Sequence, residues 1–240
     1  MSGNAPVPRP GSGEMFDRIA PRYDLLNRLL SLGIDRGWRR AAVAALRLPP
    51  RARVLDLATG TGDLALEVLR RHPDARVAGL DPARRMLAIG REKVRRRGLA
   101  GRIVLAPGVA ETLPFRDGSL DGITIAFGIR NVPDRSAALR EMARVLRPGA
   151  RVAILELGEP RTGLLAPLAR TWVRGVLPRV GGLLSRSDAY AYLADSMRAF
   201  PPPEAFAGLM EDAGLRVLEV RPLAFGVATL FVGTPREAGP

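Results

Sequence analysis

The sequence predicts an α/β fold with one mostly parallel sheet, and three observations support this prediction. Short apolar runs alternate with amphipathic stretches from Arg53 to Leu157. The first of these runs, Val54–Leu57, ends in a glycine turn that opens a helix. Two further strands, Arg216–Leu223 and Val227–Val232, predict an antiparallel hairpin near the C-terminus. Alternation of strand and helix is typical of parallel strands joined by right-handed crossovers.

Hydrophobic periodicity places the elements in order. Two helical stretches, Glu14–Leu32 and Ile34–Leu48, precede the first strand and predict a cap over the sheet, with Pro21 breaking the first of them. Seven strands are predicted, at Val54–Leu57, Val77–Leu80, Ile103–Leu105, Ile123–Ala126, Val152–Leu157, Arg216–Leu223 and Val227–Val232. Helices are predicted from Asp63 and over Pro82–Arg97, Ser136–Leu146, Leu164–Leu184, Asp188–Phe200 and Pro203–Ala213.

The glycine turn is the most informative segment of the chain. Gly60 and Gly62 permit positive φ and let a ligand approach the backbone. The helix that begins at Asp63 directs its free N–H groups toward the same turn. Asp56 and Asp63 flank the turn, and these acids would repel a pyrophosphate and attract a cation. A ligand with positive charge and hydroxyl groups fits better, and S-adenosylmethionine, with its sulfonium, ammonium and ribose, meets this description.

A second acid extends the predicted nucleoside site. Asp81 ends the strand beside the first one, where its carboxylate would accept hydrogen bonds from both ribose hydroxyls. Two alternatives remain open at this point. Ala65 stands where a dinucleotide-binding turn carries its third glycine, and some such turns tolerate alanine there. A glycine pair also occurs in turns that only connect a strand to a helix.

Composition excludes several classes of protein. The chain has no cysteine, which excludes disulfides, thiolate metal sites and a cysteine nucleophile. His72 is the only histidine and cannot build a multi-histidine metal site. No apolar stretch of about 18 residues is present to span a bilayer. The N-terminus lacks an apolar signal core, so we expect a cytoplasmic protein.

The net charge of +13 comes almost wholly from arginine, since Lys93 is the only lysine among 37 basic residues. A genome rich in arginine codons, an anionic membrane surface or nucleic acid would each explain this balance. The arginines are dispersed along the chain, which favours the first explanation and ranks nucleic acid last. Leu164–Leu184 mixes apolar residues with arginines, a pattern that fits either a cover touching an anionic membrane or a helix packed on the sheet.

The block Phe-Gly-Ile-Arg-Asn-Val at 127–132 directly follows the fourth predicted strand. With Tyr-Asp-x-x-Asn at 23–27 and Tyr-x-Tyr-Leu at 190–193, this block resembles the ubiquinone/menaquinone biosynthesis C-methyltransferases. Further matches lie at Ser31–Arg36, Ala110–Phe115, Arg144–Gly149, Leu155–Leu157 and Val176–Arg179. The resemblance implies a Rossmann-like class I S-adenosylmethionine-dependent methyltransferase fold.

Composition and hydrophobic pattern also predict a domain organisation. Residues 1–13 are expected to form a disordered tail and residues 14–240 a single methyltransferase domain. Within it, residues 14–50 form a helical cap and residues 51–158 the cofactor-binding core. Residues 159–202 form a helical lid, inserted before the terminal helix and hairpin at 203–234. The lid would cover the carboxyl ends of the strands, where ligands bind in open α/β sheets.

The resemblance implies cofactor contacts at five positions: Thr61 in the turn, Asp81 on the ribose, Val109 and Ala110 at the adenine edge, and Ala126. Together with Asp56, Thr59, Gly60 and Gly62 they make up the predicted cofactor site. Members of the family often carry Asn where Val109 stands and Ser where Ala126 stands. Only backbone contacts are therefore expected at those two positions.

The implied reaction methylates a ring carbon of a 2-polyprenyl-1,4-naphthoquinol or benzoquinol. Such a carbon becomes nucleophilic when the neighbouring hydroxyl loses its proton. Arg130 is predicted to stabilise that phenolate, because a guanidinium stays charged, with an ion pair that braces the loop as the alternative. Asn131 would add a hydrogen bond. Asp24, or a water that it holds, would act as the base and Tyr23 would orient the quinol, with packing in the cap as the alternative for both.

Several choices stay open. Naphthoquinol and benzoquinol substrates share these motifs, and the absence of an organelle-type presequence favours menaquinone biosynthesis. A nucleic-acid methyltransferase is disfavoured, since no Asn-Pro-Pro-aromatic or Asp-Pro-Pro-aromatic block follows the fourth strand. A non-catalytic cofactor-binding module is the rival outside enzymes. Peripheral contact with the inner face of the cell membrane and homo-oligomerisation are both compatible with the sequence.

Overall fold

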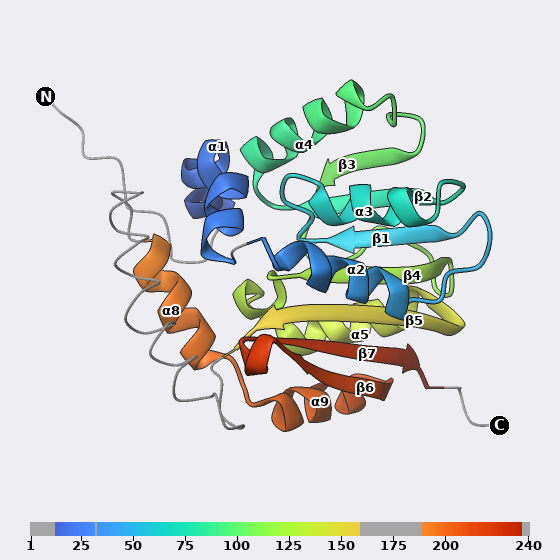
Figure 1. Ribbon diagram of the computed structural model, residues 1–240. Coiled ribbons are helices and arrows are strands. Elements are labelled where there is room, and N and C mark those ends of the chain that lie inside the picture. The colour runs from blue at the N-terminus through green and yellow to red at the C-terminus, as the bar shows by residue number, and fades with distance from the viewer. Residues whose placement is uncertain (1–12, 32, 159–188, 237–240) are drawn as a thin grey trace, which may run out of the picture.

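Seven strands form one sheet in the order β3-β2-β1-β4-β5-β7-β6 in the computed structural model, which describes residues 13–31, 33–158 and 189–236 (Figure 1). β7 pairs antiparallel with both β5 and β6, and the other neighbouring strands run parallel. The strands are β1 Arg53–Leu57, β2 Arg76–Asp81, β3 Ile103–Pro107, β4 Leu120–Ala126, β5 Leu146–Leu157, β6 Leu215–Leu223 and β7 Ala228–Pro235. This arrangement confirms the predicted mostly parallel sheet with its C-terminal antiparallel strands.

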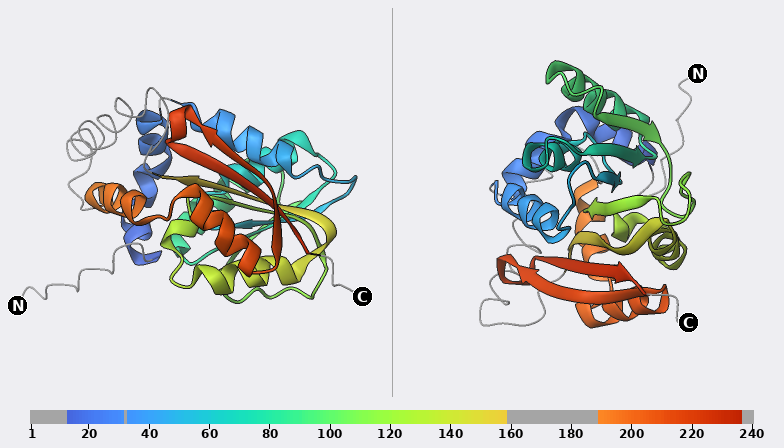
Figure 2. Two further views of the ribbon diagram at one scale, coloured as in Figure 1. Left: turned by 90° about the horizontal axis from the view of Figure 1, so that it is seen from below. Right: turned by 90° about the vertical axis from the view of Figure 1, so that its right-hand side faces the viewer.

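Helices cover both faces of the sheet (Figure 2). Side chains of α2, α3 and α4 form one core with one face, and side chains of α5 and α9 form a second core with the other. The central strands β1 and β4 are buried along almost their whole length, as expected for strands covered on both faces. The α-helices are α1 Gly13–Leu30, α2 Asp35–Ala45, α3 Asp63–Arg71, α4 Arg84–Arg96, α5 Arg135–Val145, α8 Ala189–Ala199 and α9 Pro203–Asp212.

The carboxyl ends of the parallel strands lie at one edge of the sheet, and α1 and α8 lie beyond that edge (Figure 1). The prediction that Pro21 breaks the first helix was wrong, because α1 continues through it from Gly13 to Leu30. Proline removes one backbone hydrogen bond from a helix interior. Packing of residues before and after Pro21 offsets this loss. Ala20 is buried against Met86 of α4, and Phe16 and Tyr23 pack on the same cluster.

Two predicted segments lie outside the described residues. They are residues 1–12 of the N-terminal tail and the helix at Leu164–Leu184. Gly13, the last residue of the predicted tail, begins α1 instead. α8 belongs to the predicted lid and is described. Among the described helices, none is long and apolar enough to cross a bilayer.

Candidate active site at the carboxyl ends of the strands

The glycine turn between β1 and α3 has the left-handed backbone that its sequence predicts. Gly60 has φ of 55° and Gly62, directly before α3, has φ of 80°. The turn is closed by the Gly62 N–H, which donates to the Thr59 carbonyl at 2.8 Å. Its backbone therefore faces the open edge of the sheet without a Cβ at either glycine.

Asp56, the penultimate residue of β1, is completely buried beneath this turn. Its carboxylate accepts hydrogen bonds from Thr59 Oγ1 at 2.6 Å and from Thr124 Oγ1 at 2.8 Å. Burial raises the pKa of Asp56 from 3.8 to about 6, although these hydrogen bonds oppose the shift. Asp56 thus shapes the turn and places a titratable group under it.

Asp81, at the end of β2, ties the neighbouring strand to the turn. Its Oδ2 accepts from the Gly60 N–H at 2.8 Å, and its Oδ1 accepts from the Ala83 N–H at 2.7 Å. Burial raises the pKa of this carboxyl as well. Each carboxylate oxygen has further lone pairs, so Asp81 can accept hydrogen bonds from a ligand too.

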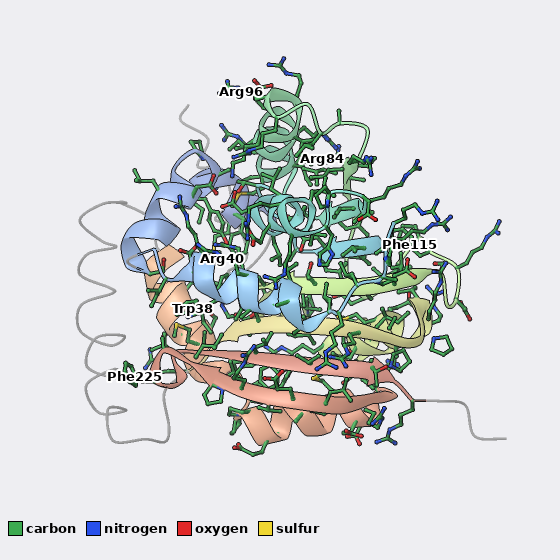
Figure 3. The ribbon with its side chains drawn as sticks, turned by 45° about the vertical axis from the view of Figure 1, so that its right-hand side comes forward. Trp38, Arg40, Arg84, Arg96, Phe115 and Phe225 are labelled. Carbon is green, nitrogen blue, oxygen red and sulfur yellow. The ribbon has the colours of Figure 1, made fainter. Side chains whose placement is uncertain are left out.

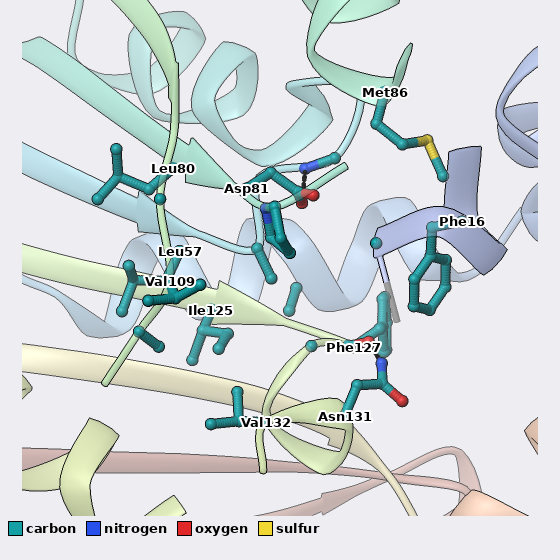
Figure 4. A pocket seen from close by; sticks show the side chains of 18 of the residues that line it. Phe16, Leu57, Leu80, Asp81, Met86, Val109, Ile125, Phe127, Asn131 and Val132 are labelled. Atoms are coloured by element: carbon teal, nitrogen blue, oxygen red, sulfur yellow. Dashed lines mark hydrogen bonds between the residues drawn. The ribbon is translucent and has the colours of Figure 1, made fainter. Parts of the chain in front are cut away.

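A cavity of about 250 Å³ opens beside the turn, and Asp81 and Asn131 enter it from opposite sides (Figure 4). Apolar side chains of α1, the strand ends and the loop after β4 make up most of its wall. Six of the predicted site residues other than Asp81 line it, namely Tyr23, Gly60, Val109, Ala110, Ala126 and Asn131. A smaller hollow of about 30 Å³ adjoins it, lined among others by Asp24, Asp56, Thr59, Thr61 and Asp63.

Lys93 of α4 joins the cap to the turn. Its Nζ donates to Thr61 Oγ1 at 2.8 Å and to Asp63 Oδ1 at 2.7 Å, and it pairs with Asp24 Oδ2 at 2.5 Å. Thr61 Oγ1 in turn donates to Asp24 Oδ1 at 2.6 Å. Asp24, the predicted base, therefore lies at the smaller hollow and is held by Lys93. The sequence analysis did not identify Lys93 as a site residue. The observation that could have drawn attention to it is that it is the only lysine in the sequence.

Arg130 is held in the loop at residues 127–132, which we call the FGIRNV loop. Its Nη1 lies 2.6 Å from Glu156 Oε1 and donates to the Phe127 carbonyl at 2.7 Å. The Arg130 N–H donates to the other oxygen of Glu156 at 3.0 Å. Arg130 is absent from the described residues that line the two hollows. Its guanidinium thus braces the loop, and Glu156, an acid inside an apolar strand, is a residue that sequence reasoning missed.

Asn131 does reach the larger cavity from the same loop. Its Oδ1 accepts a hydrogen bond of 2.8 Å from the hydroxyl of Tyr192 on α8. Its Nδ2 lies 3.5 Å from the Phe127 carbonyl, at the limit of a hydrogen bond. Tyr192 is not among the described residues that line the cavity, and it contacts Asn131, which does line it. The side chain of Tyr190 lies outside the described residues.

A model of the ubiE/COQ5 methyltransferase family matches residues 9–235 of the chain. The chain belongs to this family. A demethylmenaquinone methyltransferase of Thermus thermophilus is 52% identical over 221 residues, which cover 91% of this chain and 99% of that protein. The ubiquinone/menaquinone biosynthesis C-methyltransferase UbiE of Geotalea daltonii is 49% identical, with 92% of this chain and 94% of that protein covered.

The fold is that of the class I methyltransferases. A solved structure of a SAM dependent methyltransferase from Aquifex aeolicus has a TM-score of 0.60, with 18% identity, and covers 81% of this chain and 88% of that one. The family and the fold imply S-adenosylmethionine as the methyl donor of this methyltransferase. The resemblance predicted from the FGIRNV loop is thereby confirmed at the level of the family.

The two hollows fit the two ends of this donor. The smaller hollow is lined by ionisable side chains, which suit the charged amino-acid end. The larger cavity has Asp81 beside otherwise mostly apolar walls, which suit a ribose and an uncharged base. A pyrophosphate would instead meet Asp56, Asp63 and Asp81, so the described site does not suit a dinucleotide.

Proposed function

We propose that this chain transfers the methyl group of S-adenosylmethionine to a ring carbon of a polyprenylated quinol, converting demethylmenaquinol to menaquinol. The observation that carries the proposal is the side of the 250 Å³ cavity opposite Asp81, where Asn131 enters among apolar side chains such as Phe16 and Phe127. A nucleic-acid base with its charged phosphate backbone would find few polar partners on its walls. Relatives of about 50% identity named for quinone methylation support the same acceptor.

In this proposal the cofactor is held at the turn and the strand ends. Asp81 accepts from the ribose, and the backbone at Val109 and Ala110 borders the adenine, with Ala126 beneath it. The turn from Thr59 to Gly62, over Asp56, receives the methionine part. S-adenosylmethionine, when bound there, supplies an electrophilic methyl group on a sulfonium.

Asn131 is the proposed contact for the quinol oxygen. The Phe127 carbonyl can only accept a hydrogen bond, so the amide atom that faces it is Nδ2, and the Tyr192 hydroxyl then donates to Oδ1. The weak contact of 3.5 Å to the Phe127 carbonyl leaves Nδ2 available to donate to an acceptor oxygen. Tyr23 borders both hollows, where it can orient the quinol ring.

Arg130 serves this site as a positioning residue in the proposal. Its guanidinium lies 2.6 Å from Glu156, and Arg130 is not among the described residues that line the two hollows, so it does not face the acceptor. Its hydrogen bonds hold the loop that carries Asn131. Asp24 is likewise engaged, by Lys93 and Thr61, so we assign it to cap closure. Alignment of donor and acceptor and exclusion of water then supply much of the rate.

Methyl transfer to a defined quinol tests the proposal. The protein is incubated with S-adenosylmethionine radiolabelled at the methyl group and with chemically reduced demethylmenaquinone, and the extracted quinone is separated and counted. A parallel reaction offers the corresponding benzoquinol. Label in menaquinone is the expected result, and label only in the benzoquinone would assign the chain to ubiquinone biosynthesis. Cofactor binding without label in either quinone would overturn the proposal in favour of a binding module.

We further propose that the protein meets this acceptor at an anionic membrane surface. Its net charge of +13 and exposed apolar side chains at Leu25, Ile34 and Phe225 support such contact. α1 and Phe225 lie toward the same end of the sheet (Figure 3). Sedimentation with phosphatidylglycerol vesicles, but not with phosphatidylcholine vesicles, and release by salt are expected. Equal sedimentation with both would contradict an electrostatic contact.

A further inference from the structure

Arg39 on α2 is a charged residue of the smaller hollow to which neither the sequence pattern nor the reaction assigns a role. We propose that Arg39 binds the carboxylate of the methionine part of S-adenosylmethionine. This inference rests on the proposed function only for the identity of the cofactor. It assigns to α2, a helix of the cap, a direct part in cofactor binding.

The position of Arg39 is fixed from several sides. Its side chain is only 12% exposed, and it lines the hollow together with Asp56 and Thr61. Its Nη1 donates to the buried carboxylate of Asp35, one helical turn earlier. Its Cζ lies 5.6 Å from the ring centroid of Phe127. An ion pair and a cation–π contact therefore hold the guanidinium at the wall of the hollow.

The charges around the hollow show why a cation is needed there. Asp24, Asp56 and Asp63 line it, and carboxylates repel a ligand carboxylate, although Lys93 partly compensates the charges of Asp24 and Asp63. Arg39 is the only basic residue among the described residues lining it. Lys93 pairs with Asp24 and Asp63 and lies outside that lining. Arg39 thus supplies the positive charge that lets a zwitterionic amino acid enter an acidic hollow.

The guanidinium of Arg39 also has N–H groups that can donate hydrogen bonds to a ligand. The guanidinium has five N–H groups. The hydrogen bond that it makes among the described residues is donated by Nη1 to Asp35. A planar guanidinium can present two parallel N–H groups to one carboxylate, which a lysine cannot. Its positive charge also opposes the rise in the pKa of Asp56 that burial causes, which places the two groups in one electrostatic environment.

The test compares two ligands that differ only in the carboxylate: S-adenosylmethionine and decarboxylated S-adenosylmethionine. Their affinities are measured by titration calorimetry for the wild-type protein, Arg39→Ala and Arg39→Lys. Arg40→Ala is the matched control, because Arg40 is the next residue on α2 and is exposed (Figure 3). Removing a charge-assisted hydrogen-bond pair should weaken S-adenosylmethionine binding roughly 10- to 100-fold.

Decarboxylated S-adenosylmethionine should lose less than about 3-fold in Arg39→Ala, and Arg40→Ala should change neither affinity. Arg39→Lys should fall between the wild type and Arg39→Ala for S-adenosylmethionine alone. An equal loss of both ligands in both Arg39 variants would overturn the inference and make Arg39 a structural residue. Failure of the proposed function is distinguishable, since it would leave cofactor affinities intact and no quinol methylated.

Discussion

Nη1 of Arg130 lies 2.6 Å from Oε1 of Glu156, and the two side chains are 6% and 0% exposed. The pair joins the FGIRNV loop after β4 to the end of β5. Both oxygens of Glu156 are used, because Oε2 accepts from the Arg130 N–H at 3.0 Å. The shape of the loop that presents Asn131 therefore depends on a buried carboxylate from the neighbouring strand.

Removal of this carboxylate should be costly. Glu156→Ala leaves the Arg130 guanidinium buried without its counter-charge, and we expect the free energy of unfolding to fall by about 3–5 kcal/mol. Glu219→Ala breaks the exposed pair with Arg221 and should cost less than about 1 kcal/mol. Urea denaturation of the two variants gives both values. Equal losses would mean that the buried pair is not needed for the loop.

The parts of the site that sequence could predict are those set by the backbone. Alternating apolar runs placed the strands, and Gly60 and Gly62 indicated the left-handed turn. Parallel neighbours bring their carboxyl ends to one edge, so Asp81 was expected beside that turn and lies there. Each of these features depends on local pattern and on sheet topology, both of which a sequence carries.

Pairings between side chains that are distant in the sequence could not be predicted in this way. Glu156 follows Arg130 by 26 residues and Lys93 follows Asp24 by 69, and no local pattern links the members of either pair. For Arg130, an ion pair that braces the loop was the stated alternative to a contact with the phenolate, but its partner, Glu156 on the next strand, could not be named from the sequence. Pro21 shows the same limit, because packing of α1 on α4 outweighs a local helix-breaking signal.

Arginine should not be able to replace Lys93 functionally. Its ammonium contacts Asp24, Asp63 and Thr61 in diverging directions, and a planar guanidinium cannot reproduce that arrangement. We expect Lys93→Arg and Lys93→Ala both to speed hydrogen exchange in α1. Cofactor affinity should fall about 10-fold in each, through loss of roughly one hydrogen bond to a charged group. Calorimetry and exchange mass spectrometry measure these effects.

Arg95→Ala is the control for this experiment, since Arg95 lies on α4 with its side chain 70% exposed and should leave both readouts unchanged. Wild-type exchange rates in Lys93→Arg would show that any cation suffices to hold the cap.

Asp56 should give the protein a distinctive pH dependence. Its pKa is raised from 3.8 to about 6 by burial, so the folded protein holds this proton more tightly than the unfolded chain does. Its contribution to stability is therefore fully present below about pH 4 and is lost as the pH rises through 6. The size of the shift corresponds to about 3 kcal/mol.

Asp56→Asn cannot titrate and removes this dependence. The stability of Asp56→Asn minus that of the wild type should rise by about 2 kcal/mol between pH 4 and pH 7, whatever the constant cost of altered hydrogen bonds. Urea denaturation across that range measures the difference, in which the other titrating groups cancel. A difference that does not change with pH would show that Asp56 is ionised throughout.

Tyr192 should affect the reaction only through Asn131. Burial raises the pKa of the Tyr192 hydroxyl, so it remains a donor to Asn131 Oδ1 at neutral pH. We expect Tyr192→Phe to lower kcat about 10-fold and Asn131→Ala about 100-fold, with cofactor affinity unchanged. The double variant should match Asn131→Ala alone, because the hydroxyl then has no amide to orient. Asp195→Asn, on the exposed side of α8, is the control. Losses that multiply in the double variant would show that Tyr192 contacts the acceptor independently.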